Sequence, residues 1–288
     1  METSVPFDAP AEWSIYVFMF LASLCIGLSA TVRDIANVLQ DRVRTRRALM
    51  ANLLIPPIVA VALGFVFPLE PSAQTMLLLI AFAPGGINAV QFSTKVPGEL
   101  ANAGAILVFL SAISFVTAPI AAVLLLRDQG GAISLPFAEI STRIALLFLL
   151  PAVIGMCLRK ASNHMADKLY KPAMLVSLLA FIASVVLSTG ARQEGLDQFG
   201  SGATLAFLAF VLILMAVGWA FGGPGIEGRQ VLSVSTNLRN VGLVYVLVDG
   251  CCADNGIAAA VLGMMALMIL PNLLLTIGCA VWRKKHSQ

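Results

Sequence analysis

Long apolar segments, separated by short polar ones, follow one another along the whole chain. Each is close to the ~20 residues that a helix needs to cross the hydrocarbon core of a bilayer. The pattern therefore predicts an all-α polytopic membrane protein with nine transmembrane spans. The segments are 13–30, 47–67, 74–96, 99–126, 138–158, 170–190, 203–222, 228–250 and 256–281.

The composition supports a membrane protein and excludes several other classes. Hydrophobic residues make up 59% of the 288 residues and charged ones 11%, whereas about a quarter of the residues of a soluble domain are charged. The five cysteines lie in apolar runs or next to each other, which does not give a disulfide framework. The two histidines lie beside basic clusters outside the spans, which argues against a membrane metal site. We expect no cofactor and no nucleic-acid partner.

A basic stretch follows the first span, and it has the pattern of a surface helix. Five arginines lie between residues 31 and 48. Four apolar residues in the same stretch are spaced as one face of a helix, which predicts a short amphipathic helix on the membrane surface. These residues are Ile35, Val38, Leu39 and Val43.

The positively charged residues predict the orientation of the spans. With nine spans, the loops on one side of the membrane hold 14 of the 18 Lys and Arg residues, and those on the other side hold two, Arg127 and Arg192. Because Lys and Arg accumulate in cytoplasmic loops, we expect the C-terminus in the cytoplasm and the N-terminus outside, in the plasma (bacterial inner) membrane. The remaining two, Arg143 and Arg239, lie within spans.

The third and the eighth spans contain residues that do not suit a continuous helix. The third contains Ala83-Pro-Gly-Gly-Ile-Asn-Ala-Val90, in which the proline lacks a backbone donor and the two glycines weaken the helix. The eighth contains the polar stretch Ser233–Tyr245. Each is expected to form two half-helices joined by an irregular segment, which a membrane protein tolerates only where protein or water surrounds it.

Arg239 is the least expected residue of the eighth span. A guanidinium at the bilayer centre costs roughly 2.5–3.5 kcal/mol on insertion scales, so it should face protein, water or an anion. Two interpretations stay open: Arg239 takes part directly in binding a substrate or ion, or it is a structural clamp on neighbouring carbonyl groups. Hydroxyl and amide side chains surround it in the sequence, at Ser233, Ser235, Thr236, Asn237 and Asn240.

The two interrupted spans also suggest an inverted repeat. They run in opposite directions across the membrane, and each is followed by a proline-containing span at the same interval, 34 residues from Gly85 to Pro119 and from Asn237 to Pro271. In this scheme spans one to four match spans six to nine, and the fifth has no partner. Interrupted segments at corresponding places in two halves point to the midplane site of a secondary transporter.

Four stretches, taken in order, carry a resemblance to a known family: Met19–Asp34, Ala83–Gly86, Leu238–Leu243 and Pro271-Asn272. Over nearly the whole chain, the sequence resembles the bile acid:sodium symporter superfamily. The resemblance implies two inverted five-helix repeats, here without the first helix, that form a core domain with two crossing discontinuous helices and a panel domain. Within one transporter domain, 1–288, the panel would comprise about 13–30 and 138–190, and the core about 47–126 and 203–281.

The resemblance also implies where sodium would bind, and this chain departs from that pattern. In sodium-coupled members the second crossing helix carries a Glu and, four residues later, a Gln-Asn pair, which help to hold two sodium ions. Here the Glu becomes Ser235 and the pair becomes Arg239-Asn240, as in bacterial relatives of unassigned substrate, and the Ser-Asn ligands of the first crossing helix fall on Ala89-Val90. The departure puts sodium coupling in doubt. The candidate sodium ligands that remain are Asn88, Gln91 and Asn240.

The distribution of acidic residues points the same way. All 15 Asp and Glu residues lie in predicted loops or span ends. A hard cation at the midplane would therefore have only carbonyls, hydroxyls and amides as ligands, and Arg239 would repel it. The same pattern argues against an intramembrane aspartyl protease or a carboxylate proton relay.

These observations predict a secondary transporter of a small organic anion, such as a carboxylate, a sulfonate or a bile-acid-like molecule, and not an enzyme. Arg239 would attract the anion, and half-helix N-termini would add partial positive charge. The alternatives are an ordinary sodium:organic anion symporter of the same family, a carrier of similar architecture such as an auxin-efflux-like protein, and a non-transporting sensor or scaffold. The candidate substrate-binding residues are Arg239, Asn240, Asn237, Thr236, Ser235, Gly85, Gly86, Asn88, Gln91, Ser111, Ser114 and Asn272.

Cysteine labelling tests the predicted orientation. In a background without the native cysteines, a single cysteine near the N-terminus or at Asp254 should react with a membrane-impermeant maleimide added outside the cells. A cysteine at Lys285 should react only after the membrane is permeabilised. Labelling of both termini from the same side would contradict the nine-span count and the repeat that depends on it.

Overall fold

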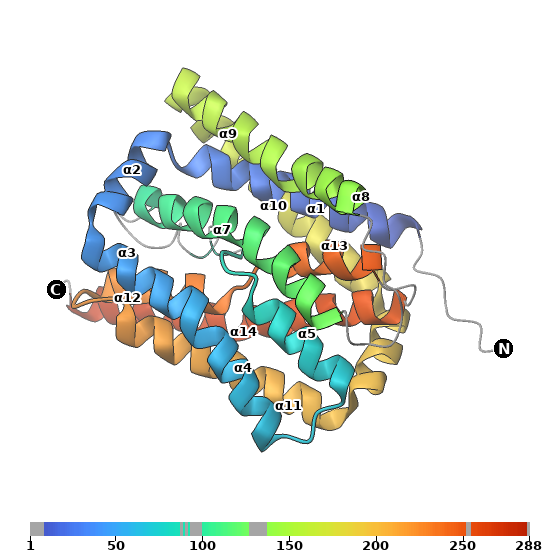
Figure 1. Cartoon of the computed structure of the whole chain (residues 1–288). Helices are drawn as coiled ribbons and strands as arrows, with labels where there is room; N and C mark the ends of the chain where they lie inside the picture. Colours follow the sequence, from blue (N-terminus) through green and yellow to red (C-terminus); the bar gives the residue numbers. More distant parts are fainter. Residues whose placement is uncertain are drawn as a thin grey trace.

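The structure, a computed structural model, describes residues 9–86, 89, 92, 100–126, 137–251 and 255–286. The described residues are almost entirely helical, without a strand among them, as the apolar pattern predicts. Figure 1 shows long helices that run side by side. The helices are α1 (Ala9–Ser29), α2 (Val32–Gln40), α3 (Arg42–Leu49), α4 (Ile55–Val66), α5 (Pro71–Ala81), α7 (Leu100–Leu126), α8 (Phe137–Ile144), α9 (Leu150–Ala161), α10 (Asn163–Leu187), α11 (Thr189–Phe221), α12 (Ile226–Asn237), α13 (Val241–Cys251) and α14 (Asn255–His286), with π-helical turns η1 (Met50–Leu54) and η2 (Ala145–Leu149). Helix α12 ends at Asn237 and α13 begins at Val241, so the eighth predicted span is interrupted.

Eight helical segments among the described residues are long and apolar enough to cross a membrane, and they correspond to the predicted spans other than the third. The third is represented by the shorter apolar helix α5, and most of the chain between Gly86 and Leu100 lies outside the described residues, so the count of nine stays a prediction. The eight segments are Pro10–Ser29, Arg42–Val66, Ala105–Leu125, Ile140–Ala161, Asn163–Leu187, Gly202–Phe221, Ile226–Asp249 and Leu267–Lys285.

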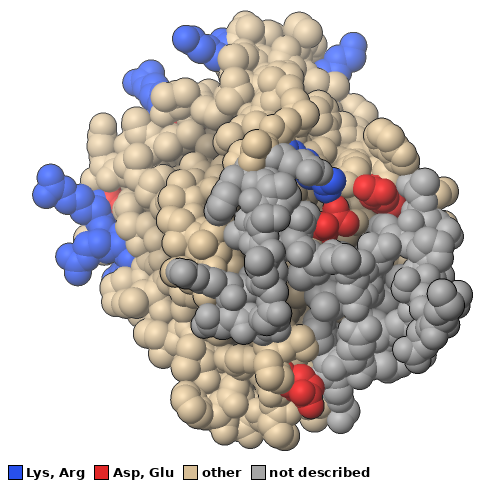
Figure 2. Space-filling view, turned by 45° about the vertical axis from the view of Figure 1, so that its right-hand side comes forward, with Lys and Arg blue, Asp and Glu red and all other residues tan. Residues whose placement is uncertain are grey.

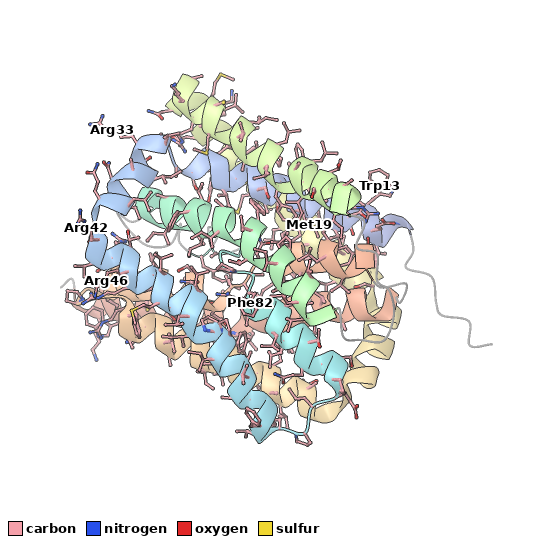
Figure 3. The ribbon with its side chains drawn as sticks, viewed as in Figure 1. Trp13, Met19, Arg33, Arg42, Arg46 and Phe82 are labelled. Carbon is pink, nitrogen blue, oxygen red and sulfur yellow. The ribbon has the colours of Figure 1, made fainter. Side chains whose placement is uncertain are left out.

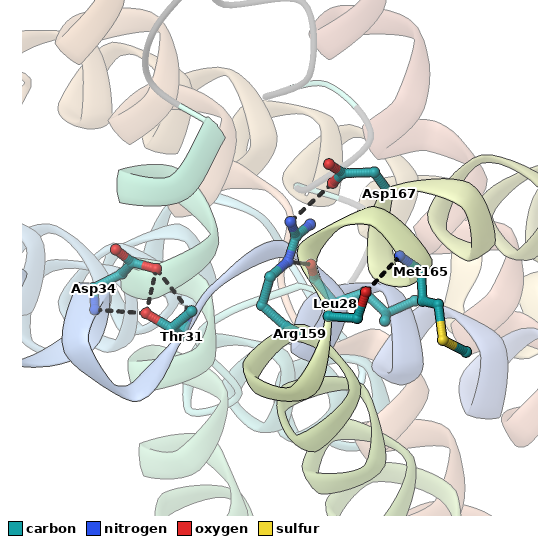
Figure 4. A network of polar contacts seen from close by, with 7 residues as sticks. Leu28, Thr31, Asp34, Arg159, Met165 and Asp167 are labelled. Carbon is teal, nitrogen blue, oxygen red and sulfur yellow. Dashed lines mark hydrogen bonds and ion pairs between the residues drawn. The ribbon is translucent and has the colours of Figure 1, made fainter.

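The basic stretch after the first span forms two helices instead of one. The start of α2 is fixed by a capping box, in which Thr31 and Asp34 each accept a hydrogen bond from the backbone N–H of the other (Figure 4). Asp41 then ends α2 and caps α3, which continues through η1 into the second span. The single helical face predicted from Ile35 to Val43 is therefore divided at Asp41, and only its first part is a separate helix.

Helix α1 packs against α9 and α10, and α1 and α9 run along the upper edge of Figure 1. Two glycines permit the contact between α1 and α9: a Cβ on Gly27 would lie 2.1 Å from Ala152 O, and one on Gly155 would lie 2.5 Å from Leu24 O. Small residues of this kind let membrane helices approach closely, so that van der Waals contacts hold them together.

A second group of helices surrounds α11, which packs against α12 and α14 and also contacts α4 and α5 (Figure 1). Helix α7 contacts both groups, through α1 on one side and α5 and α13 on the other. The first group contains the predicted panel segments and the second the predicted core segments. Their separation into two domains stays a prediction.

An ion pair joins α8 to α13 at the end of the molecule opposite α2 and α3 (Figure 1). Arg143 Nη1 lies 2.6 Å from Asp249 Oδ2, and both side chains are partly exposed. Arg143 is one of the two arginines that the sequence places within spans, and a carboxylate neutralises it. Arg239, the other, is in a different situation.

Basic side chains gather at one end of the molecule. Figure 3 places Arg33, Arg42 and Arg46 at this end and Trp13 at the opposite one. In Figure 2 the basic side chains project mainly from the left and upper edges, and most of the visible acidic ones lie in the right-hand half. This is the charge asymmetry from which the orientation was predicted, and the orientation itself stays a prediction.

Candidate functional site

Two backbone hydrogen bonds join the end of α5 to the break between α12 and α13. Gly86 N donates to Leu238 O and Asn240 N donates to Ala83 O, each over 2.8 Å. Backbone N–H and C=O groups that lack a partner within their own helix are thus paired with one another. Such pairing is what a membrane interior requires of non-helical backbone.

Two adjacent glycines make this close approach possible. Gly85 has a positive φ of 77°, a conformation that side chains disfavour. A Cβ on Gly86 would lie 2.2 Å from Leu238 O, so the two backbones meet only because residue 86 has no side chain. The irregular joint that the sequence predicts around Pro84 is therefore present, as far as Gly86.

The end of α5 meets the break between α12 and α13 at a place called the crossing below, where helix ends and prolines disturb the hydrogen bonding of three carbonyl groups. Pro56 lacks the N–H that would bond the carbonyl of Asn52, four residues earlier. Pro84 likewise offers no N–H to the carbonyl of Ile80, which accepts from Ala83 N over 3.2 Å instead. The carbonyl of Ala81 is released because α5 ends there. A buried carbonyl without a donor costs about 1–3 kcal/mol, so these groups need partners from elsewhere.

Arg239 supplies those partners. Its Nε donates to Ile80 O over 3.2 Å, and its Nη2 donates to Asn52 O over 3.0 Å and to Ala81 O. Its Nη1 donates to Asn52 Oδ1 over 3.4 Å and to Thr236 O over 3.5 Å. Because the side chain is only 2% exposed, the guanidinium is held entirely by these oxygens. This geometry is that of the structural clamp, one of the two interpretations that the sequence left open.

Polar residues of α7 complete the crossing. Ser111 Oγ donates to Gly85 O over 3.0 Å, and Ser114 Oγ accepts from Asn240 Nδ2 over 3.3 Å. The same Asn240 accepts from Leu243 N over 3.2 Å, which caps the start of α13. The structure therefore brings together Arg239, Asn240, Thr236, Gly85, Gly86, Ser111 and Ser114 from the predicted set.

Asn237 is the residue of the crossing with unused hydrogen-bonding capacity. It is fully buried, and neither its Oδ1 nor its Nδ2 has a hydrogen-bond partner. Unpaired buried polar atoms of this kind call for an explanation such as a bound solute or water. Ser235 and Asn272 each donate to a carbonyl of their own helix, Leu232 O and Met268 O, and the structure does not join them to Arg239. Asn272 Oδ1 also lacks a hydrogen-bond partner, but its Nδ2 is used.

Asn88 and Gln91, the remaining predicted residues, lie outside the described residues. Among the residues that are described, there is no group of three or more His, Cys, Asp and Glu side chains able to hold a metal ion.

Asn52 is a site residue that sequence reasoning missed. Besides its two contacts with Arg239, its Nδ2 donates to Thr236 Oγ1 over 3.2 Å, so it connects the second span to the crossing. The available signal was an asparagine inside an apolar span, four residues before Pro56. It was weak, because nothing in the sequence indicates which span the asparagine faces.

A helix interrupted between α12 and α13, whose break meets the end of α5 beside a buried charge inside an apolar bundle, is typical of polytopic transporters with discontinuous helices. The family model of the sodium bile acid symporter family matches residues 16–198. The chain belongs to this family, whose members are transporters and not enzymes.

One curated relative is an uncharacterised sodium-dependent transporter of Bacillus subtilis, YocS. It is 22% identical over 243 residues, which cover 80% of this chain and 72% of that protein. The family match ends at residue 198, before α12 and α13, so it does not include Arg239. The role of the second interrupted span must therefore be inferred from this chain.

The contact at Gly86 predicts the effect of a substitution. Gly86→Leu places a side chain against Leu238 O and forces the two backbones apart, so transport should fall to background while membrane insertion survives. Gly202→Leu is the matched control, since the nearest atom to a Cβ there, Pro68 O, lies 3.4 Å away. Uptake and the amount of protein in the membrane are measured for both. Normal uptake by Gly86→Leu would show that the crossing is not needed for transport.

Proposed function

We propose that this protein is a secondary transporter that moves a small organic anion, such as a carboxylate, a sulfonate or a bile-acid-like molecule, across the membrane by alternating access. Arg239 supplies the positive charge that attracts the anion. One observation carries the proposal: the described partners of the buried Arg239 guanidinium are all uncharged. The crossing therefore holds a positive charge that no described carboxylate neutralises, in contrast with Arg143.

Arg239 would act on the anion through its field instead of through contact, because neighbouring oxygens already accept hydrogen bonds from each of its nitrogens. At an effective dielectric constant of about 20, two unit charges about 8 Å apart attract each other by about 2 kcal/mol. That corresponds to roughly thirtyfold in affinity. An anion thus need not touch the guanidinium to be selected by it.

Direct contacts would come from other residues at the crossing. The free amide of Asn237 offers one acceptor and an NH₂ donor group, and it lies two residues from Arg239. Thr236 and Asn240 already have hydrogen-bond partners here, so we assign them to holding the crossing together. In this proposal Asn237 orients the anion by hydrogen bonds, and the positive charge of Arg239 attracts it.

Sodium symport is the second candidate, and the name of the Bacillus relative favours it. A sodium ion needs several oxygen ligands, and carbonyls released at broken helices are suitable ones. In this chain Arg239 donates to four such carbonyls, those of Ile80, Ala81, Asn52 and Thr236. We propose that the guanidinium takes the place of a bound cation and that transport does not require sodium.

Replacing Asn52 separates the charge of Arg239 from its structural role. Asn52→Asp keeps an acceptor for Arg239 Nη1 and adds a carboxylate that neutralises the guanidinium. If the charge attracts the anion, half-maximal uptake of labelled taurocholate, cholate or pyruvate into proteoliposomes should need roughly thirtyfold more substrate, with the melting temperature preserved. Arg239→Lys, which keeps the charge without the planar fork, should retain more uptake than Arg239→Gln.

Asn52→Ala is the control, because it removes the amide contacts without adding a charge. Unchanged uptake by Asn52→Asp, together with a lower melting temperature for Arg239→Gln, would assign Arg239 to the clamp alone. No uptake of any of these anions by folded wild-type protein would contradict the proposed function.

Replacing sodium with choline tests the coupling. The rate of uptake of the same labelled anions in choline should stay within about twofold of the rate in sodium. The reason is that the cation at the crossing is the Arg239 guanidinium, which is part of the protein and does not depend on sodium in the medium. A fall to background in choline would favour ordinary sodium symport, with Asn88, Gln91 and Asn240 as the ligands to test. A Ser235→Glu, Arg239→Gln double variant, which restores the family pattern, should gain sodium dependence.

A further inference from the structure

Two hollows adjoin one another at the basic end of the molecule, and they share Pro224 and Arg229. The first, of about 620 Å³, lies between the start of the second span and the loop between α11 and α12. The second, of about 540 Å³, continues from it between α11, α12 and α14. The first is cationic and the second is apolar.

The cationic hollow is formed where two arginines meet at one glycine. Arg229 Nε donates to Gly223 O over 2.8 Å, and a Cβ on the same glycine would lie 3.2 Å from Arg47 Nη1. None of the described residues that line this hollow is acidic. Arg47 is exposed and forms no ion pair with another described residue. Two guanidinium groups that lie beside the same glycine and line one hollow suit a phosphate group.

The apolar hollow has the form of a groove open to the hydrocarbon. Trp219 and Trp282 lie along it, and the Arg229 guanidinium stands 5.9 Å from the centre of the Trp219 ring. The groove is open at Gly278, where a Cβ would meet nothing within 4 Å. Neighbouring side chains of α14 such as Ile277 are exposed, as expected of a surface that faces lipid. Tryptophan is typical of the depth at which headgroups and acyl chains meet.

We propose that the two hollows form one binding site for an anionic phospholipid. The phosphate lies between Arg47 and Arg229, and an acyl chain follows the groove past Trp219 and Gly278. A soluble anion would use only the first hollow, whereas a phospholipid matches the change from cationic to apolar along both. A third hollow overlaps the first at Arg47 and Gly223, and Asp41 and Glu227 line its remainder. These carboxylates disfavour an anion in that part, so we place the phosphate on the side of Arg229.

The two tryptophans of the groove provide a direct readout. In a Trp13→Phe background, the fluorescence comes from Trp219 and Trp282 alone. The protein is placed in phosphatidylcholine nanodiscs that contain increasing amounts of phosphatidylglycerol with brominated acyl chains, which quench tryptophan on contact. Half-maximal quenching should need about tenfold less brominated phosphatidylglycerol than brominated phosphatidylcholine, since each basic residue near a membrane surface contributes several-fold to binding an anionic lipid.

Variants identify the site. Arg47→Gln with Arg229→Gln should reduce the preference to within twofold, and Gly278→Phe should lower the quenching by both lipids because it fills the groove. Arg33→Gln with Arg42→Gln removes the same net charge from the same end of the molecule and should keep the preference. Arg47→Gln alone, which removes no described hydrogen bond, replaces the double variant if that variant does not fold.

Three results would overturn the proposal. The first is equal quenching by the two lipids in the wild-type groove. The second is the same loss of preference in the Arg33, Arg42 control, which would assign the effect to general surface charge. The third is displacement of the brominated lipid by millimolar glycerol phosphate, which would make the site one for soluble phosphate.

Discussion

A carbonyl group without a donor is the constraint on which the centre of this molecule depends. Inside a bilayer no water is available, so every break in a helix creates acceptors that protein must satisfy. Pro56 and the end of α5 create two of them at one place, and Arg239 donates to both. It also donates to the carbonyl of Ile80, to which Pro84 offers no N–H and Ala83 donates. A planar guanidinium with five N–H groups suits this task better than any other side chain, since it reaches several acceptors at once without having to accept in return.

The same residues explain why the break is stable and local. The carbonyls of Ala83 and Gly85 bond to Asn240 N and to Ser111, so the joint is held from both the opposite crossing segment and α7. Removing a single contact leaves the others in place. Removing the guanidinium releases oxygens from the second, third and eighth predicted spans together, and these spans are far apart in sequence.

The sequence predicts the helical class and most of the spans. A run of ~20 apolar residues indicates a membrane-spanning helix regardless of which other helices pack against it. It also predicts the break at Pro84, where the backbone itself lacks a donor. It does not predict the partners of Arg239. Those partners are backbone carbonyls, which every residue possesses, and only packing decides which of them lie within reach. The role of Asn52 was not predicted for the same reason, since only packing brings it next to Arg239.

Where a prediction failed, short-range polar contacts were responsible. Asp41 divides the basic stretch because its carboxylate caps a new helix, an effect that the spacing of apolar residues does not record. The single face predicted from the apolar residues is therefore divided at a point where a local cap, and not hydropathy, decides the structure.

A covalently attached cation has a thermodynamic consequence that a bound sodium ion does not have. Sodium leaves the protein on the inner side and carries the energy of its gradient with it, whereas Arg239 returns unchanged at the end of each cycle. If the anion travels alone, only its own gradient and the membrane potential determine the direction of flow. A potential of about 100 mV, negative inside, acts on a monovalent anion with about 2.3 kcal/mol directed outward. A carrier built around Arg239 would thus be suited to export, and would concentrate its substrate in the cell only if another ion were coupled to it.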